Sequence, residues 1–380
     1  MKNKIIYLSL ILIVLLSCSE NNKTTKKKEV KADIKTSTNQ SKKKHVVDTN
    51  INEIAQTIGG FENNIFSNKN YMSLVEKKYL RFKNSKLQPI NNWIKTNLNI
   101  SKKNKQKTLF YPFAGADFIY ANSFFPDLDN YIMVGLEPPG EVPNLKDLSK
   151  QELSKYCNDV LKSLSANMRV GFFLTKRMAI EFNKVKVDGT IHSILFYVAR
   201  TGHKIVDIKH FNFSNDGKLI YTSNAKKSDG FEIQVIDKEN KVKNIYYCSF
   251  NLHNSNEELE SKLFKWVDSF GGHYTMLKAA SYLNHKSYFS KTRNFILNKS
   301  SVVLQDDSGI PFKFFDDTKW NTNLYGEYNR VISLFSNMLQ KDLKLSYQNK
   351  TKVVSSKLPF RIGYNVQVGN TNLQVSYKKN

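Results

Sequence analysis

The chain of 380 residues is poor in cysteine and proline, and its acidic residues are far outnumbered by basic ones. Its 3 cysteines permit at most one internal disulfide, which excludes a small disulfide-rich scaffold. Its 8 prolines are scattered, and no stretch rich in Pro, Gly or Ser divides the sequence into separate domains. Beyond residue 18, no apolar run is long enough to span a membrane. The bulk of the chain is therefore expected to fold as one globular unit.

The sequence also lacks the common arrangements of catalytic or metal-binding histidines. It contains no Ser-His-Asp order and no His-Glu-x-x-His helix. His203 and His210 would face opposite sides of a strand, while His273 and His285 would lie about 120° apart around one helix. His192, inside an apolar helix, is interpreted as a core residue. We therefore predict no metal site built on histidine, and the sequence leaves any cofactor unknown.

The N-terminus resembles a bacterial export signal. Lys2 and Lys4 precede an apolar run over residues 5–16, which is too short for a bilayer core of about 30 Å and fits the apolar part of a signal peptide. The run ends in Leu-Leu-Ser-Cys at residues 15–18, which resembles the lipobox of bacterial lipoproteins. This resemblance implies that residues 1–17 are removed and that Cys18 carries the lipid anchor, with palmitate-type acyl chains. An ordinary secretory signal with an incidental cysteine is the alternative.

Residues 18–48 are expected to form a disordered tether. They are mainly Lys, Thr, Ser, Asn and Glu with almost no large apolar side chain, so they cannot bury enough surface to offset their ordering entropy. The lysine blocks at residues 26–28 and 42–44 would extend the tether, or could lie on anionic lipid headgroups. In Gram-negative lipoproteins, which this N-terminus resembles, an acidic residue directly after the lipidated cysteine indicates retention in the inner membrane. This chain has Ser19 at that position. We therefore predict the outer membrane.

The rest of the chain is strongly basic. Of the formal net charge of +25, Lys2 and Lys4 supply two and the tether five, which leaves +18 on residues 49–380. In an exported protein this charge favours an anionic partner, such as an acidic glycan, lipopolysaccharide phosphate or lipid headgroups. Nucleic acid is not expected, because no nucleic-acid-binding motif accompanies the charge. A generally lysine-rich composition explains the same charge without a ligand, and the oligomeric state stays open.

Hydrophobic patterns predict an α/β fold. We expect a helical lead-in over residues 49–107 and a single domain over residues 108–380, in which a mixed sheet opens with a β-α-β unit, continues with antiparallel strands and is covered by helices. Strands are predicted at residues 108–113, 131–137, 204–213, 231–237, 243–252, 301–304, 311–315, 360–365 and 372–377. Helices are predicted at residues 117–125, 148–167, 190–200, 257–270, 274–285 and 289–298. Cys157 and Cys248 are interpreted as two separate buried thiols, with a disulfide as the alternative.

The β-α-β start is the first candidate site. Residues 109–117 read Leu-Phe-Tyr-Pro-Phe-Ala-Gly-Ala-Asp, and a second strand ends at Glu137, about 20 residues after Gly115, which is the layout of a nucleotide site. In such a site the helix start faces phosphate and the acid binds ribose hydroxyls. The block resembles the start of an S-adenosylmethionine-dependent methyltransferase, although Gly115 stands alone and Pro112 interrupts the strand. The alternative is a structural unit in which Asp117 caps the helix.

Asp306 and Asp307 form the second candidate site. Two adjacent carboxylates between strands could bind a hard cation or place one acid in a cleft. The alternative is a hairpin turn in which Asp307 or Ser308 bonds the backbone and Gly309 takes positive φ.

A third candidate is the stiff loop over residues 138–143, which leaves the end of a predicted central strand, where open α/β sheets bind their ligands. Glu137, just before this loop, is the preferred functional acid. Glu141 within the loop is a candidate ligand-binding residue together with Gly115 and Asp117. A solvated glutamate at the end of a strand is the alternative interpretation of Glu137.

The first two candidate sites and residues 358–364 resemble sequences in a group of uncharacterised bacterial exported proteins and lipoproteins. The resemblance covers most of residues 108–377. This resemblance implies one shared fold and brings no activity. The favoured function is a binding or structural envelope lipoprotein with an anionic ligand. The rival is an envelope hydrolase or metal-dependent enzyme using Glu137 with Asp306 or Asp307, whose carboxylates must converge within about 10 Å. Methyltransferase-like cofactor binding at Gly115 and Glu137 is a further alternative.

Overall fold

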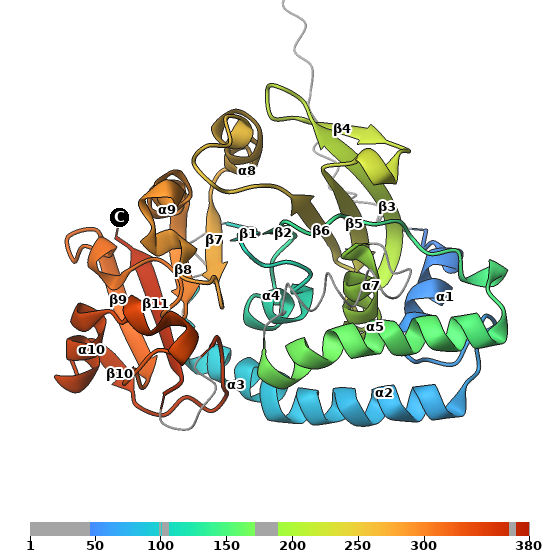
Figure 1. Ribbon diagram of the computed structural model, residues 1–380, viewed down its shortest axis with the longest axis horizontal. Helices are drawn as coiled ribbons and strands as arrows, with labels where there is room; N and C mark the ends of the chain where they lie inside the picture. Colours follow the sequence, from blue (N-terminus) through green and yellow to red (C-terminus); the bar gives the residue numbers. More distant parts are fainter. Residues whose placement is uncertain (1–45, 99, 101–105, 172–188, 365–369, 380) are drawn as a thin grey trace, which may run out of the picture. The chain divides into compact units, whose positions relative to one another are not determined.

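A single sheet of eleven strands runs through the described part of the chain, in the order β10-β9-β11-β8-β7-β1-β2-β6-β5-β3-β4 (Figure 1). This computed structural model describes residues 46–98, 100, 106–171, 189–364 and 370–379. The predicted signal peptide, Cys18 and residues 19–45 of the predicted tether lie outside the described residues. The described residues belong to one compact unit over residues 45–380. Its parallel and antiparallel strands with packed helices confirm the predicted mixed α/β fold.

Five parallel strands form the middle of the sheet. In spatial order they are β6 (Val242–Ser249), β2 (Asn130–Gly135), β1 (Thr108–Tyr111), β7 (His273–Leu277) and β8 (Ser300–Gln305). The chain adds strands outward from β1, first through β2 to β6 on one side and then through β7 to β8 on the other. The strand order therefore reverses between β1 and β7. In open α/β sheets the ligand crevice lies at such a point, beyond the carboxyl ends of the strands.

Antiparallel strands extend both edges. One edge contains β5 (Gly230–Ile236), β3 (Lys204–Phe213) and β4 (Leu219–Thr222), and the other contains β11 (Asn372–Lys378) and β9 (Trp320–Gly326), followed by β10 (Val353–Ser355), which is parallel to β9. The β5–β6 hairpin turns at Asn240, whose φ is 60°. A short helix, α10 (Lys341–Gln348), packs beside β9 and β10 through Leu343.

Helices cover both faces of the sheet. One face carries α1 (Thr49–Ile58), α2 (Lys69–Phe82), α3 (Gln88–Asn97), α4 (Phe118–Phe124), α5 (Lys150–Val170) and α7 (Ile191–Thr201). The other carries the π-helix η4 (Leu259–Phe264), α8 (Lys265–Asp268) and α9 (Ser290–Lys299). Side chains alternate along β1, so Leu109 and Tyr111 enter the first core and Phe110 the second. The predicted lead-in contains α1, α2 and α3, which pack into the first core and so form part of the domain.

The helices α5 and α7 both end at a glycine, and α5 also begins at a capping box, as sequence rules favour. Ser149 and Glu152 form a capping box at the start of α5, and Gly171, with φ 88°, ends this helix. Gly202, with φ 77°, ends α7 in the same way. These signals explain why the predicted helices over residues 148–167 and 190–200 lie close to the observed ones.

Three predicted elements are wrong. Residues 274–285, predicted as a helix, contain most of the central strand β7 and a 3-10 turn, Leu283–His285. All five residues of β7 are buried, as is typical of a strand covered on both faces, so it lacks the polar alternation that marks a strand. The predicted strand at 311–315 is a 3-10 turn, Phe312–Phe314, and β9 follows it. The described residues 360–364 of the strand predicted at 360–365 contain bends and no strand, and Gly363 has φ 68°.

The two remaining cysteines are separate buried thiols, as predicted. Cys157 of α5 lies in the core on one face of the sheet and Cys248 of β6 in the core on the other, so the sheet separates them. Burial raises the pKa of the Cys157 thiol to about 12. Within the described ranges, no helix combines the length and the apolar character needed to cross a membrane.

Candidate functional site

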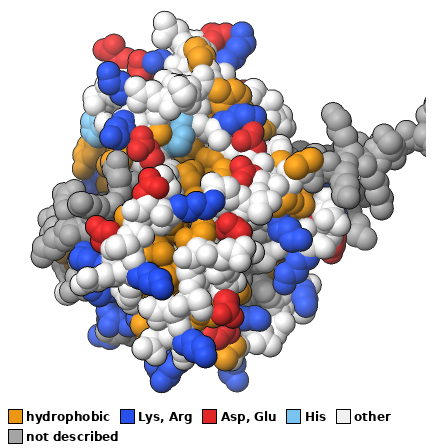
Figure 2. Space-filling model, turned by 90° about the vertical axis from the view of Figure 1, so that its right-hand side faces the viewer, with side chains coloured by type: hydrophobic (Ala, Val, Ile, Leu, Met, Phe, Trp, Pro, Cys, Tyr) orange, Lys and Arg blue, Asp and Glu red, His pale blue; other side chains and the backbone are white. Residues whose placement is uncertain are grey.

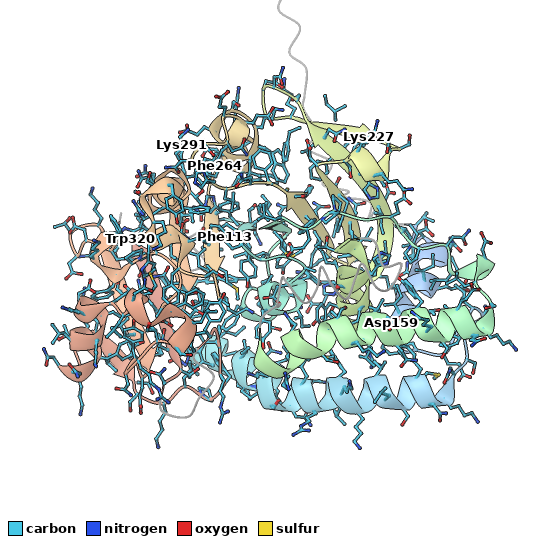
Figure 3. All side chains as sticks on the ribbon, viewed as in Figure 1. Phe113, Asp159, Lys227, Phe264, Lys291 and Trp320 are labelled. Atoms are coloured by element: carbon cyan, nitrogen blue, oxygen red, sulfur yellow. The ribbon has the colours of Figure 1, made fainter. Side chains whose placement is uncertain are left out.

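A cavity of about 180 Å³ opens at the carboxyl ends of β1, β2, β6 and β7. Its apolar wall includes Phe113, Phe250 and Phe289, and its polar wall includes Glu137 and Lys278. Phe113 follows β1 and lies near the centre of the molecule, close to β7 (Figure 3). The cavity thus occupies the place where the strand order reverses, which is the expected ligand position in a sheet of this topology.

The structure brings Gly115 and Glu137 together in the wall of this cavity. The chain turns sharply after β1, and the N–H groups of Ala114 and Gly115 donate to the carbonyl of Val134 at 2.8 and 3.4 Å. Gly115 has φ 55°, a conformation that favours glycine, and a Cβ there would lie only 3.8 Å from Glu137 Oε2. Glu137 itself lies just beyond the end of β2, where Tyr247 donates its hydroxyl to the Glu137 carbonyl at 2.8 Å.

Asp117 does not cap α4, so that interpretation of its role is wrong. Its carboxylate accepts hydrogen bonds from the Tyr111 hydroxyl at 2.8 Å and from the Asn167 amide at 3.1 Å. It also forms a buried ion pair with Lys278 at 2.8 Å. Burial raises the pKa of Asp117, and the neighbouring Lys278 ammonium opposes this effect. Asp117 therefore belongs to a buried polar network that fixes the start of α4.

Lys278, which sequence reasoning missed, connects this network to the cavity. It follows β7 directly, its side chain is 1 % exposed, and its ammonium group donates to the carbonyl of Gly171. The ammonium also lies 4.0 Å from the centre of the Tyr120 ring, which adds a cation–π contact. The signal was hidden because residues 274–285 were predicted as a helix, where this lysine would have been one more surface charge.

The loop after Lys278 has an unusual backbone. Ala279, Ser281 and Tyr282 have φ values of 51°, 52° and 55°, and Phe113, which also lines the cavity, has φ 62°. Such values are uncommon for residues with a side chain, and each costs on the order of 1–3 kcal/mol. Strained backbone persists only where the surroundings hold it, and it clusters at ligand-binding and catalytic sites. The positive φ values of Phe113, Ala279 and Ser281, which all line this cavity, are therefore typical of a ligand-binding or catalytic site.

Asp306 helps to hold the strained loop in place. Its Oδ2 accepts a hydrogen bond from the Ala279 N–H at 2.9 Å, and the neighbouring Ser308 hydroxyl accepts one from the Ala280 N–H at 2.8 Å. Asp306 also makes the local turn, because its Oδ1 accepts from the Ser308 N–H at 3.0 Å. Asp306 rather than Asp307 or Ser308 thus makes the turn contact, and Gly309 does not have the predicted positive φ. The turn leads into a 3-10 helix and does not join paired strands.

Asp307 is also part of the support. One oxygen of its carboxylate accepts a hydrogen bond from the Tyr282 hydroxyl, and the other accepts one from the Asn372 amide at 2.9 Å. Asp306 and Asp307 are both buried, and neither lines the cavity that contains Glu137. The structure therefore does not bring the predicted carboxylates together in one open cleft.

Glu141 is exposed and does not line the cavity. The loop that contains it is fixed against the start of α7, because the N–H groups of Thr190 and Ile191 donate to the carbonyls of Pro138 and Pro139, both at 3.0 Å. This loop places Glu137 beside the cavity but directs Glu141 to solvent.

The described residues contain no group of three His, Cys, Asp or Glu side chains placed to hold a metal ion. His192 is a buried core residue, as interpreted from the sequence, and its Nδ1 lies 2.6 Å from the Tyr156 hydroxyl. Scans of the sequence against protein-family models, of the curated proteins and of solved structures each found no match. The site must therefore be interpreted from its own geometry.

Proposed function

We propose that the chain is an exported, lipid-anchored protein of the cell envelope whose folded domain binds a nucleoside-type small molecule at the carboxyl edge of the sheet. The lipobox-like residues 15–18 and the polar tether support export and anchoring. The binding proposal rests on one observation: Glu137 and Gly115 meet in a cavity walled by strained backbone, at the point where the strand order reverses.

The cavity wall matches the chemistry of a nucleoside. A carboxylate such as Glu137 accepts the two hydroxyl groups of a ribose, while the absence of a side chain at Gly115 leaves room for the sugar to approach. Phe113 and Phe289, whose ring centres are 5.8 Å apart, offer an apolar surface to a flat base. A plain sugar would use the carboxylate but not this aromatic surface.

The same region disfavours phosphate groups. The helix that follows Gly115, α4, has only 7 residues and is preceded by Asp117, whose carboxylate is held in the Lys278 ion pair. An ordinary phosphate site offers a glycine-rich turn and free N–H groups. A nucleotide phosphate placed here would instead meet the carboxylate of Asp117. We therefore expect an uncharged or cationic nucleoside, such as adenosine or S-adenosylmethionine, to bind more tightly than ATP.

The hydrolase alternative receives less support. Asp117 is the other carboxylate in the cavity wall, but Lys278, Tyr111 and Asn167 all hold it. Acid–base hydrolysis needs two carboxyl groups on either side of a substrate. Glu137 is the remaining carboxylate among the described residues that line the cavity; it forms no ion pair with them, and its Oε2 accepts hydrogen bonds from the Leu136 N–H at 3.2 Å and the Tyr247 hydroxyl at 3.5 Å.

Isothermal titration calorimetry on the mature chain, with Cys18→Ser to keep it free of lipid, tests the proposal. Adenosine and S-adenosylmethionine should bind, and ATP should bind at least tenfold more weakly. Glu137→Gln should weaken nucleoside binding by about 10- to 100-fold, the range expected for a lost hydrogen bond to a charged group. Glu141→Gln, the same change at an exposed position, should have no effect. Equal affinities of the Glu137→Gln and unmodified proteins would refute the site.

A further inference from the structure

A second and larger cleft, of about 780 Å³, opens on the face of the sheet that α2 and α5 cover. These two helices lie side by side, and the cleft is formed by their C-terminal parts, the π-helix η1 (Lys83–Leu87) and residues 358–361 (Figure 1). It shares no lining residue with the cavity that contains Glu137.

The cleft is lined by basic side chains from all of these segments, and no acidic side chain is among the described residues that line it. The basic residues are Lys78, Arg81, Lys86, Arg169 and Arg361. None of them takes part in an ion pair between described residues. Elsewhere basic and acidic side chains are interleaved, as on the face in Figure 2, and on α5 Asp159 pairs with Lys155 and Lys162 at 2.8 and 3.2 Å (Figure 3). The charge of the cleft is therefore concentrated and uncompensated.

Between these charges the cleft is apolar. Phe82, Met168 and Phe360 are buried beneath it, and the half-buried Leu358 extends the apolar surface toward the rim. A cleft that combines uncompensated cations with an apolar floor is complementary to a molecule with an anionic head and a hydrocarbon part. A purely polar anion would leave the floor in contact with water.

The π-helix turns one of these cations inward. Pro89 has no N–H group that could donate to the carbonyl of Ser85, four residues earlier. Just before Pro89 the helix widens, and the Gln88 N–H donates to the carbonyl of Lys83, five residues earlier. Turns of this kind are rare and are frequent at functional sites. Here the turn places Lys86 in the cleft with only 7 % of its surface exposed.

Lys86 is stabilised by few contacts for a buried cation. Its ammonium group donates to the Arg361 carbonyl at 3.0 Å. Burial, with Lys278 and Arg361 nearby, lowers the pKa of Lys86 to about 8. An anion in the cleft would offset the unfavourable charge and accept the remaining ammonium protons.

We propose that this cleft binds a lipid with a phosphate headgroup, the phosphate lying between Lys86 and Arg361 and the first part of an acyl chain lying on Phe82 and Phe360. The charge complementarity and the apolar floor identify this occupant. The site is separate from the proposed nucleoside site. The two proposals therefore fail or succeed independently, and Glu137→Gln should leave lipid binding unchanged.

Calorimetry with short-chain lipids below their micelle concentration tests this proposal. The mature Cys18→Ser chain should bind dihexanoyl phosphatidic acid at least tenfold more tightly than dihexanoyl phosphatidylcholine or inorganic phosphate. Lys86→Met, which keeps the side-chain length, and Arg361→Gln at an exposed position should each weaken binding of phosphatidic acid by about tenfold. Lys162→Met on the outer face of α5 is the matched control and should change it less than twofold.

All the variants carry the same basic tether, so binding of phosphatidic acid to the tether would be equal in all of them. A difference between variants therefore reports binding in the cleft. Unchanged affinity in both cleft variants, with the fold confirmed by circular dichroism, would show that phosphatidic acid binds elsewhere and would overturn the proposal. Equal affinity for inorganic phosphate would overturn the lipid assignment, and equal affinity for phosphatidylcholine would overturn recognition of the anionic head. Loss of binding in both cleft variants with retention in Lys162→Met supports it.

Discussion

The ammonium group of Lys278 lies 2.8 Å from a carboxylate oxygen of Asp117, and both side chains are at most 2 % exposed. This contact joins the end of β7 to the start of α4 across the point where the strand order reverses. Because Tyr111 and Asn167 also donate to Asp117, the carboxylate is satisfied on both oxygens. The network fixes the two loops that form opposite walls of the cavity, so its integrity should matter for both stability and ligand binding.

Removing the cation from this pair should be strongly destabilising. Lys278→Met leaves Asp117 buried without its counter-charge, and breaking such a pair costs about 3–5 kcal/mol. We expect the free energy of unfolding at pH 7, measured with urea, to fall by about this amount. The loss should be smaller at low pH, because Asp117 without the lysine takes up a proton more readily.

A double substitution separates the pair energy from general damage to the core. Asp117→Asn combined with Lys278→Met should cost less than the sum of the two single changes, because neither charge is then left alone. Lys162→Met, which removes an exposed partner of Asp159, should cost about 0.5 kcal/mol or less. Additive single effects would contradict the ion pair as the source of the stability.

Alanine substitutions at Gly115 and Gly271, which have similar backbone conformations, separate the effect of backbone strain from an effect on ligand binding. Gly115 has φ 55° and lies against Glu137, while Gly271 has φ 77° and a Cβ there would meet nothing within 4 Å. Alanine at either position should cost about 1 kcal/mol of stability, because both must keep a left-handed conformation. Only Gly115→Ala should also weaken nucleoside binding, by about tenfold, in calorimetry. Similar loss of binding in Gly271→Ala would mean that Gly115 acts on the ligand only through the fold.

Much of the sheet was predictable from the sequence because its signals are local. The strand over Lys204–Phe213 and the helix ended by Gly202 follow from alternation, helical period and glycine. The strand β7 was missed because a strand buried on both faces has no alternation, and the following residues Ala279 and Ala280 have a helical pattern. Missing β7 also hid the position where the strand order reverses, since that position depends on which strands pair.

The candidate site was predictable only in part. Gly115 and Glu137 belong to one β-α-β unit, so their spacing along the chain indicated their contact. Asp306 and Asp307 follow β8, which lies on the other side of β7 from β1, and their bonds to the loop at Ala279 and Tyr282 depend on long-range packing. The basic cleft was invisible for the same reason, because its charges come from segments far apart in the sequence.

The proposed lipid anchor gives a prediction about localisation. In a Gram-negative host that expresses the full chain, Cys18 should become labelled by a palmitate analogue and the protein should fractionate with the outer membrane. Cys18→Ser should abolish the label, because the thiol that would carry the lipid is then absent. Ser19→Asp is the matched change for sorting and should move the labelled protein to the inner membrane. Labelling of Cys18→Ser would contradict the assignment.

His273 should make the protein sensitive to mild acid. This residue of β7 packs between Phe110 and Phe295, with neither ring nitrogen bonded to a described residue. Burial lowers its pKa to about 3; the Asp268 carboxylate opposes this effect and the Lys299 ammonium adds to it. The unfolded chain binds a proton here below about pH 6.5 and the folded protein only near pH 3, so stability falls by about 1.4 kcal/mol for each pH unit between them.

Leucine at this position removes that proton linkage while keeping an apolar side chain of similar volume. At pH 7 His273→Leu should change the free energy of unfolding little, because the histidine is neutral in both states and leaves no partner without a hydrogen bond. At pH 4.5 it should be more stable than the unmodified protein by about 2.5 kcal/mol, after subtracting the difference at pH 7. Urea unfolding at both pH values measures this. Burial also lowers the pKa values of His203 and His285 to about 4, but these residues contribute equally in both proteins. If the unmodified protein and His273→Leu lose the same free energy of unfolding between pH 7 and pH 4.5, His273 is ruled out as a source of acid sensitivity.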